Sequence, residues 1–263
     1  MEEITVIILA YNSEKHIKKS IDSIINQTFK SWKLIVINDG STDDTIKIIN
    51  SYTELLKKKL LVINNKKNLG INLSMNQALT NVNTQYFTRQ DSDDISDQNR
   101  LAILIESLKK NNNYDFVSSR MISLIKKEII LPNKLIKYPQ KKDFIKSLPF
   151  CNAPTLFRSN ILSKVKYNES HIYKKRFEDY EFFFRCYLNG YKGFNIDKVT
   201  YFVRQDYSYQ NKITIHQRVI ECLLKLKIYK KFNLDIRYFI YILLPLIKII
   251  IPSFLFKIYR KIN

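Results

Sequence analysis

The sequence predicts an α/β protein with a mostly parallel, doubly wound sheet. Short apolar runs rich in β-branched residues alternate with segments whose apolar residues recur at helical spacing. Polar loops follow three of these runs at the point where each one ends. This alternation is typical of βαβ units, in which helices connect parallel strands.

The first hundred residues supply the sheet and its first helices. Strands are predicted at Ile4–Leu9, Trp32–Ile37, Leu60–Ile63 and Tyr86–Thr88. A helix is predicted from Ser13, a good N-cap, because isoleucines recur three or four positions apart behind it. Further helices are predicted over Thr45–Leu56 and Leu73–Leu79.

The second half is predicted to be more irregular. A helix is expected over Asn99–Lys109, with short strands at Phe116–Ser118 and Ile129–Ile130 and a helix near Asn160. A last helix opens at Arg176 and is expected to stop at Gly190, since glycine is a common helix terminator.

The C-terminal region, residues 211–263, differs in composition. Lysine and arginine outnumber acids there, and two apolar runs, Tyr238–Ile247 and Ile249–Phe256, are expected to be broken by Pro245, Lys248 and Pro252. A helix needs about 20 apolar residues to span a bilayer, and each run is shorter than that. Basic amphipathic helices of this kind suit an anionic membrane surface. A helix pair packed on the catalytic domain, or a dimer seam, is the alternative.

Composition sets the range of partners. The chain has 263 residues, 45% of them apolar, and a formal net charge of +20, which attracts nucleic acid, anionic membranes or anionic small substrates. The three cysteines show no C-x-x-C spacing, so a zinc site or disulfide framework is not indicated. We expect a cytoplasmic protein without a signal peptide.

Three carboxylates, Asp91, Asp93 and Asp94, crowd the loop after the fourth strand. Like charges this close repel unless a cation sits among them, and Mg²⁺ or Mn²⁺ takes oxygen ligands of this kind. An EF-hand loop counted from Asp91 would need Gly and Glu where Ser96 and Ala102 stand, so that interpretation fails. A solvated acidic turn that caps the next helix is the plain alternative.

The polar loops at Tyr11–Asn12, Asp39–Ser41 and Asp91–Asp94 all follow strands. In an open α/β sheet such loops converge on one edge, where ligands bind. The first loop has no G-x-G-x-x-G, and the chain has no phosphate-binding loop of the nucleotide triphosphatases. We therefore expect neither a dinucleotide site nor ATP or GTP hydrolysis.

The segments ITVIILAYN, KLIVINDGSTDDT, NLGINLSMNQAL, TRQDSDDISDQNRL and FEDYEFFFR resemble, in order and spacing, those of family 2 glycosyltransferases with the GT-A fold. The resemblance covers about residues 4–208 and implies a GT-A catalytic domain over residues 1–210. Residues 1–100 would form its nucleotide-sugar half and 101–210 its acceptor half. It also implies a nucleotide-diphosphate sugar donor, a divalent metal and an inverting transfer.

The resemblance assigns a role to individual residues of the donor side. Asp93 would ligate the metal, and Asp91 would share in this or hold the donor's ribose or sugar. Asp39 would bond the uracil N3 donor, Tyr11 would stack near the base, and Arg204 would meet the diphosphate. The remaining donor-side residues that it implies are Ala10, Asn12, Lys67, Asn68, Gly70, Asn76, Arg89 and Ser92.

Two positions of the sequence depart from the family pattern. Asn38 stands where an additional Asp is common, and Met75 stands where Arg is frequent. Arg89 and Arg100 flank the acidic loop, where they would balance its charge or simply be surface arginines. Asp94 would make a supporting or sugar contact.

On the acceptor side the resemblance implies Asp179 as the catalytic base, with Glu178 in support, and an acceptor cleft lined by Asn152, Pro154 and Thr155. Carboxylates in the first turn of a helix also suit its dipole without any catalytic role. Likewise, the segment around Pro154 fits an ordinary turn.

We therefore expect a metal-dependent hexosyltransferase, peripheral on the inner face of the cell membrane, that moves a hexose or N-acetylhexosamine from a UDP-sugar to a lipid-linked surface glycan. Galactose and glucose are the first candidates. A sugar-phosphate nucleotidyltransferase would want a Gly-rich basic loop where Ala10–Glu14 stand. A non-enzymatic polyanion-binding or membrane-binding module is the third possibility, although no aromatic RNA-binding platform is recognisable and no nucleic-acid partner is expected.

Overall fold

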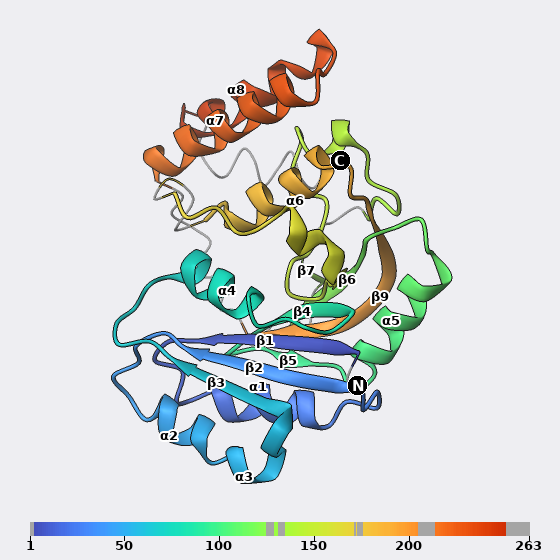
Figure 1. The fold of residues 1–263 in the computed structure, drawn as a ribbon. Helices are drawn as coiled ribbons and strands as arrows, with labels where there is room; N and C mark the ends of the chain where they lie inside the picture. The colour runs from blue at the N-terminus through green and yellow to red at the C-terminus, as the bar shows by residue number, and fades with distance from the viewer. Residues whose placement is uncertain are drawn as a thin grey trace.

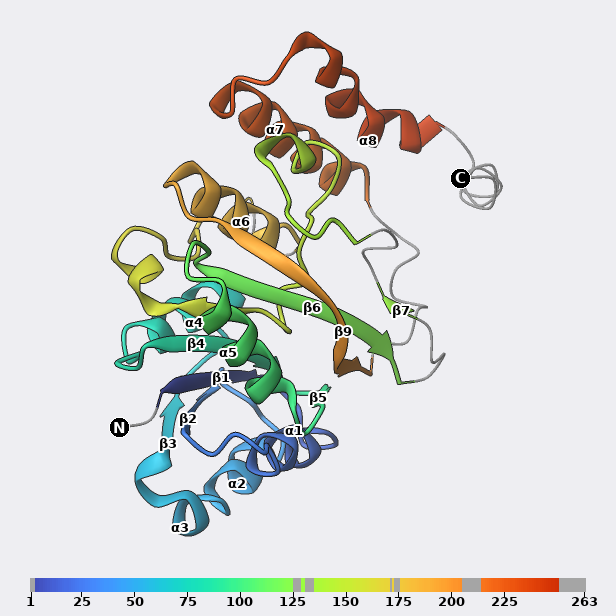
Figure 2. The same ribbon diagram turned by 90° about the vertical axis from the view of Figure 1, so that its right-hand side faces the viewer.

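The computed structural model describes residues 3–124, 129–130, 135–170, 172, 176–204 and 214–250. Its centre is a mixed sheet, and within the described residues the strand order is β3-β2-β1-β4-β8-β6-β9-β5, with β7 beside β6 (Figures 1 and 2). The predicted α/β class is confirmed.

The strands of the first half are parallel and lie where the sequence predicts them. β1 pairs in parallel with β2 and β4, and β2 pairs in parallel with β3. The strands that the structure describes are β1 Ile4–Ala10, β2 Trp32–Asn38, β3 Leu60–Asn64, β4 Tyr86–Asp91, β5 Ile95–Ser96, β6 Phe116–Ser123, β7 Ile129–Ile130, β8 Leu156–Arg158 and β9 Gly193–Val203.

Helices cover both faces of the sheet (Figure 1). They are α1 Ile17–Ile25, α2 Thr45–Asn50, α3 Thr53–Leu56, α4 Ile71–Leu79, α5 Arg100–Lys110, α6 Glu178–Leu188, α7 Ile215–Lys231 and α8 Ile240–Ile250. Short 3-10 turns lie at η1 Lys57–Lys59, η2 Lys141–Asp143, η3 Ser159–Ser163 and η6 Ile236–Tyr238.

Two cores flank the sheet because successive strand side chains point to opposite faces. Ile4, Val6 and Ile8 of β1 pack with α1 and α5 on one face. Ile7 of the same strand packs with α4, α6 and α7 on the other. Burial on both sides explains why β1 is a continuous apolar run instead of an alternating one.

Two expectations about the first helices are wrong. The predicted helix Thr45–Leu56 is divided into α2 and α3, because Tyr52 turns inward and its hydroxyl donates to Asp22 Oδ1 at 2.6 Å. Ser13 does not cap α1, which begins at Ile17 after a turn in which the Ser13 carbonyl accepts from the His16 and Ile17 amides.

The strands β5, β8 and β9 were not predicted. β8 pairs antiparallel with β4 and β6, so it joins the two halves into one sheet. β9 pairs in parallel with β6, and its far end pairs with the two-residue β5 directly behind the acidic loop. These short or interrupted segments lack a clear period of two, and long-range pairing defines them.

The expected break at Pro245 is also wrong, since α8 runs through it. A proline removes the hydrogen bond to the carbonyl four residues earlier, which is that of Tyr241. That carbonyl accepts instead from the buried Lys225 Nζ at 3.4 Å. Most of the second predicted apolar run, Ile249–Phe256, lies outside the described residues.

The helix α7 packs on the body of the protein through Ile220, Leu224 and Ile228, which share a core with α6. The division at residue 210 stays a prediction. Among the helices that the structure describes, none is long and apolar enough to cross a membrane.

Candidate active site

A cavity of about 390 Å³ opens where β1, β2 and β4 end. Its size falls within the usual range of small-molecule sites. It is lined by Leu9, Ala10, Tyr11, Asp39, Asn68, Gly70, Ile71, Arg89, Asp91, Ser92 and Asp93. The three polar loops therefore do converge on one edge of the sheet, as their positions after strands predicted.

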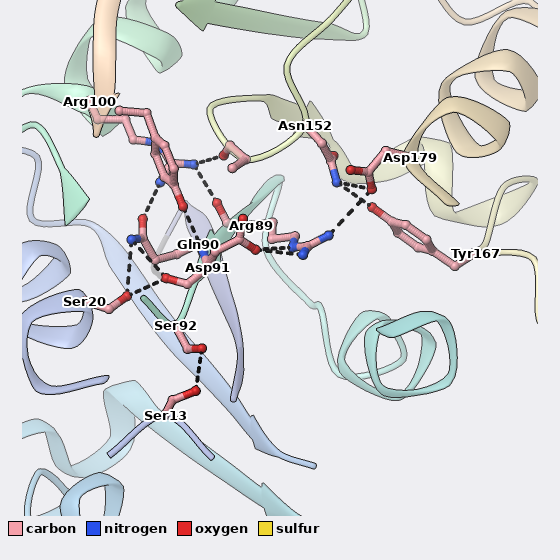
Figure 3. A network of polar contacts seen from close by, with 12 residues as sticks. Ser13, Ser20, Arg89, Gln90, Asp91, Ser92, Arg100, Asn152, Tyr167 and Asp179 are labelled. Carbon is pink, nitrogen blue, oxygen red and sulfur yellow. Dashed lines mark hydrogen bonds and ion pairs between the residues drawn. The ribbon is translucent and has the colours of Figure 1, made fainter. Parts of the chain in front are cut away.

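Hydrogen bonds between loops fix the first wall of the cavity. Asn12 has a positive φ of 48°, and its side-chain oxygen accepts from the Thr42 amide at 2.9 Å. Its own amide donates to Ser41 Oγ at 3.0 Å. The hydroxyls of Ser13 and Ser92 lie 2.8 Å apart, which ties this loop to the acidic loop (Figure 3).

Asp39 organises a second wall. Its Oδ1 accepts from the Leu69 amide at 3.0 Å and from Asn65 Nδ2 at 2.9 Å, and its Oδ2 accepts from the Gly70 amide at 2.9 Å. Charge-assisted bonds of this kind hold a loop firmly. The carboxylate thus positions the turn that carries Asn68 and Gly70 while it also lines the cavity.

The acidic loop holds an excess of negative charge. Asp91 Oδ1 pairs with Arg89 Nη2 at 2.7 Å, while the Arg204 amide donates to Asp94 Oδ1 at 2.8 Å. Burial, and then Asp91, raise the pKa of Asp93. Burial, and then Asp91 and Asp93, raise the pKa of Asp94 to about 8.

These residues fit a divalent cation. Asp93 faces the cavity, and no Lys, Arg or His nitrogen of the described residues lies within ion-pair distance of its carboxylate. No group of three or more metal-ligating side chains is found in the part of the chain that the structure describes. A cation held here therefore needs further oxygen ligands from a substrate, as Mg²⁺ sites with one or two carboxylates and phosphates do.

Arg89 connects the acidic loop to helix α6. Its buried guanidinium lies between Asp91 and Asp179, with Nη1 3.6 Å from Asp179 Oδ1 (Figure 3). Asn152 Nδ2 donates to the same Asp179 oxygen at 2.6 Å and lies 3.2 Å from the Tyr167 hydroxyl. Asp179 does not itself line the cavity, and Arg89, which does, connects it to the lining.

Two adjacent carboxyl groups at the start of α6 have raised pKa values. Burial raises the pKa of Asp179 to about 6, and Arg89 acts against this rise. Burial, and then Asp179, raise the pKa of Glu178 to about 7. Glu178 Oε2 is buried without a hydrogen-bond partner among the described residues. Perturbed carboxyl groups beside a polar cavity are typical of catalytic sites.

The idea that Arg89 and Arg100 are surface arginines is wrong. Arg100 is fully buried, and it donates to Gln90, Ser96 and Thr88 side chains and to the Ala153 carbonyl. Its guanidinium also lies 5.0 Å from the ring centroid of Tyr201.

Sequence reasoning missed the part played by Tyr201. Its hydroxyl accepts from the Asp91 amide at 2.9 Å and so holds the backbone of the acidic loop. The pairing of β9 with both β5 and β6 places it there, and that pairing joins segments far apart in the sequence.

Some predicted residues lie away from the cavity lining. Asn76 donates to the Tyr167 carbonyl at 2.9 Å and to Glu169 at 2.8 Å. Pro154 and Thr155 are buried, and the Thr155 hydroxyl donates to the Cys151 carbonyl. The roles of these three residues stay predictions. Lys67 and Arg204 lie beside lining residues.

Larger cavities lie elsewhere, including one of about 750 Å³ lined in part by Tyr114, Lys141 and Lys192. It contains no carboxylate, and it carries none of the predicted site residues. The chemistry of the lining, and not the volume, identifies the site at Asp91.

The fold has close counterparts among solved structures. The structure of S. aureus TarS residues 1–349 in complex with UDP covers 87% of this chain and 72% of its own, with a TM-score of 0.66 and 21% identity. Together with the curled, mostly parallel sheet, this likeness identifies the GT-A fold and confirms the predicted class.

The chain belongs to Glycosyl transferase family 2, whose profile matches residues 5–171. It is 28% identical over 259 residues to EpsE of Bacillus subtilis, itself assigned as a glycosyltransferase, covering 98% of this chain and 93% of that one. It is also 30% identical over 143 residues to WfgD of Escherichia coli, named as a UDP-Glc:alpha-D-GlcNAc-diphosphoundecaprenol beta-1,3-glucosyltransferase, covering 51% and 55%. Membership favours glycosyl transfer over the nucleotidyltransferase and non-enzymatic alternatives.

Proposed function

We propose that the protein is an inverting, metal-dependent hexosyltransferase that moves a hexose or N-acetylhexosamine from a UDP-sugar to a lipid-linked surface glycan. The observation that carries this proposal is that Arg89 joins Asp179 to the acidic loop at one cavity. The UDP bound by TarS and the substrates in the name of WfgD support the donor and the acceptor class. Glucose and galactose are the first candidate sugars.

The donor would lie across the cavity. Tyr11 is half exposed at its mouth, where it is free to stack on the base, and Asp39 would accept from uracil N3. Lys67 and Arg204 would meet the diphosphate from its two sides. Mn²⁺ or Mg²⁺ held by Asp93, with Asp91 beside it, would supply the positive charge that a leaving diphosphate requires.

The acceptor hydroxyl needs a base, since an alcohol is a weak nucleophile near neutral pH. The Asp179 carboxylate takes the hydroxyl proton as the oxygen bonds to the anomeric carbon and the bond to the diphosphate breaks. General-base assistance of this kind contributes roughly 10²–10⁴-fold. Attack from the face opposite the diphosphate converts an α-linked donor into a β-linked product. Asn152 orients the base through its 2.6 Å hydrogen bond.

The test is UDP release from a panel of UDP-, GDP- and dTDP-sugars, with and without Mn²⁺. We expect turnover with a UDP-sugar and Mn²⁺ only, and loss of turnover in Asp93→Ala. Asp179→Asn should keep nucleotide binding and lose transfer by about 10²–10⁴-fold. Asp197→Asn is the matched control, because Asp197 is exposed on β9, where it pairs with Arg120. Metal-independent turnover, or equal loss of binding and transfer in Asp179→Asn, would remove these assignments.

A further inference from the structure

The outer side of the α7–α8 pair carries an exposed apolar face. The two helices pack on each other and form the outermost layer, beyond α6 from the sheet (Figure 2). Seven apolar side chains on this pair are between 37% and 66% exposed: Ile215, Val219, Leu223, Phe239, Ile240, Leu243 and Leu246. We call these seven residues the outer face.

The outer face is separate from the side that packs on the domain. At 3.6 residues per turn, the stripe Ile215, Val219 and Leu223 is centred about 120° around α7 from the buried Ile220 and Leu224. The α8 part lies alongside it, since the Tyr229 and Phe239 rings are 5.8 Å apart. One side of the helix pair therefore packs in the core, and a second apolar side is exposed.

A basic rim borders the outer face. Lys230 and Lys231 are exposed at the C-terminal end of α7, and with Lys227, Leu223 and Leu226 they line a hollow of about 270 Å³. The acidic residue of α7, Glu221, is neutralised by Arg218 at 3.1 Å and Lys225 at 3.5 Å. Apolar side chains beside the exposed Lys230 and Lys231 match an anionic lipid interface, where acyl chains and phosphates lie at adjacent depths.

We propose that the outer face docks on an anionic phospholipid surface, with Leu223 and Leu243 at the acyl boundary and Lys230 and Lys231 at the headgroup phosphates. This inference deepens the proposed function and rests on it for its purpose, which is to bring the site to a lipid-linked acceptor.

The docked helix is fixed to the helix that bears the base. Lys227 Nζ lies 3.4 Å from Oε1 of the fully buried Glu181, which stands two residues after Asp179 on α6. Membrane contact through α7 would therefore orient α6, and with it Asp179, relative to the lipid surface.

The experiment is co-sedimentation of the full chain with vesicles of phosphatidylcholine alone, or of phosphatidylcholine mixed with phosphatidylglycerol. We expect salt-sensitive binding to the mixed vesicles. The double variant Leu223→Glu with Leu243→Glu should bind at least about tenfold more weakly, since two half-exposed side chains lose apolar burial. Lys230→Gln with Lys231→Gln should lose the preference for phosphatidylglycerol. Leu55→Glu is the matched control, because Leu55 is 67% exposed on α3.

Unfolding curves show whether each variant folds, and UDP release in detergent solution is measured in parallel. Vesicle binding without UDP release would refute the proposed function and leave the docking face standing. UDP release with no vesicle binding would overturn the docking face. It would also be overturned if the glutamates abolish a dimer in light scattering and leave vesicle binding unchanged, because the face would then serve a second copy.

Discussion

Arg89 shares one partly buried positive charge between two carboxylates, Asp91 of the acidic loop and Asp179 of α6. A guanidinium stays charged throughout the physiological pH range, so it attracts both carboxylates over that whole range. At this scale the central quantity is the pKa of Asp179, which burial raises and Arg89 lowers. The balance leaves a carboxyl group that is ionised at neutral pH and has a pKa only slightly below it.

The pH dependence of turnover follows from this balance. Asp179 acts as a base only when ionised, so kcat should fall as the pH drops through about 6, the pKa of that carboxyl group. Arg89→Met removes the positive charge, which should move this limb of the profile to higher pH. Initial rates from pH 5 to 8.5 at saturating donor measure it, with Arg120→Met as the control. A profile that stays flat below pH 6 contradicts the role of Asp179.

At the scale of elements, two loops in close contact form one wall of the cavity. Gly40 lies in the loop that follows β2 and has a φ of +72°. A Cβ placed there would lie 2.5 Å from the Lys67 carbonyl carbon. Only glycine permits this approach, which brings the backbone at Lys67 and Asn68 against the β2 loop. The Asp39 carboxylate completes the junction by binding the amides of Leu69 and Gly70.

Comparing Gly40→Ala with Gly190→Ala distinguishes the effect of a close atomic contact from the effect of backbone conformation. Both glycines have positive φ, but a Cβ at Gly190 meets no atom within 4 Å. Gly190→Ala should cost about 1–2 kcal/mol of unfolding free energy, the usual cost of a left-handed residue. Gly40→Ala should cost more, and it should also weaken UDP binding, because it displaces the loop carrying Asn68. Urea unfolding and UDP titration measure the two effects. Equal losses in both variants would show that the contact with Lys67 is unimportant.

At the scale of the whole molecule, Arg100 ties the first half of the chain to the second. Its buried guanidinium donates to Gln90 and Thr88 of β4 and to the carbonyl of Ala153 in the segment before β8. Burial lowers its pKa to about 10, so it remains charged at neutral pH. The strand β8 pairs with β4 directly beside this contact, so one residue supports both the sheet and the acidic loop.

Arg100→Met should destabilise the protein by about 3 kcal/mol or more, since several buried acceptors lose their donor at once. Because Arg100 also supports the backbone at Arg89, UDP binding should weaken in the fraction that stays folded. Arg120→Met is the matched control, because its ion-pair partner Asp197 is 72% exposed and the pair should contribute less than about 1 kcal/mol. Denaturant unfolding measures both variants, and similar losses would contradict the linking role of Arg100.

The sequence by itself determined the parallel strands and the chemistry at their ends. Runs such as Ile4–Leu9 carry their secondary structure in neighbouring residues, and strand direction then places Tyr11, Asp39 and Asp91 at one edge. Local order is enough for such features because both the periodicity and the loop that follows lie within a few residues.

Only the tertiary structure decided which of these residues act together. The pairing of Arg89 with Asp179, the turning of Asn76 toward Tyr167 and the hold of Tyr201 on Asp91 all join segments far apart in the sequence. Pro245 stays within α8 for the same reason, since Lys225 of another helix satisfies the carbonyl of Tyr241. Such contacts depend on how the halves of the sheet meet, and no pattern within one segment encodes that meeting.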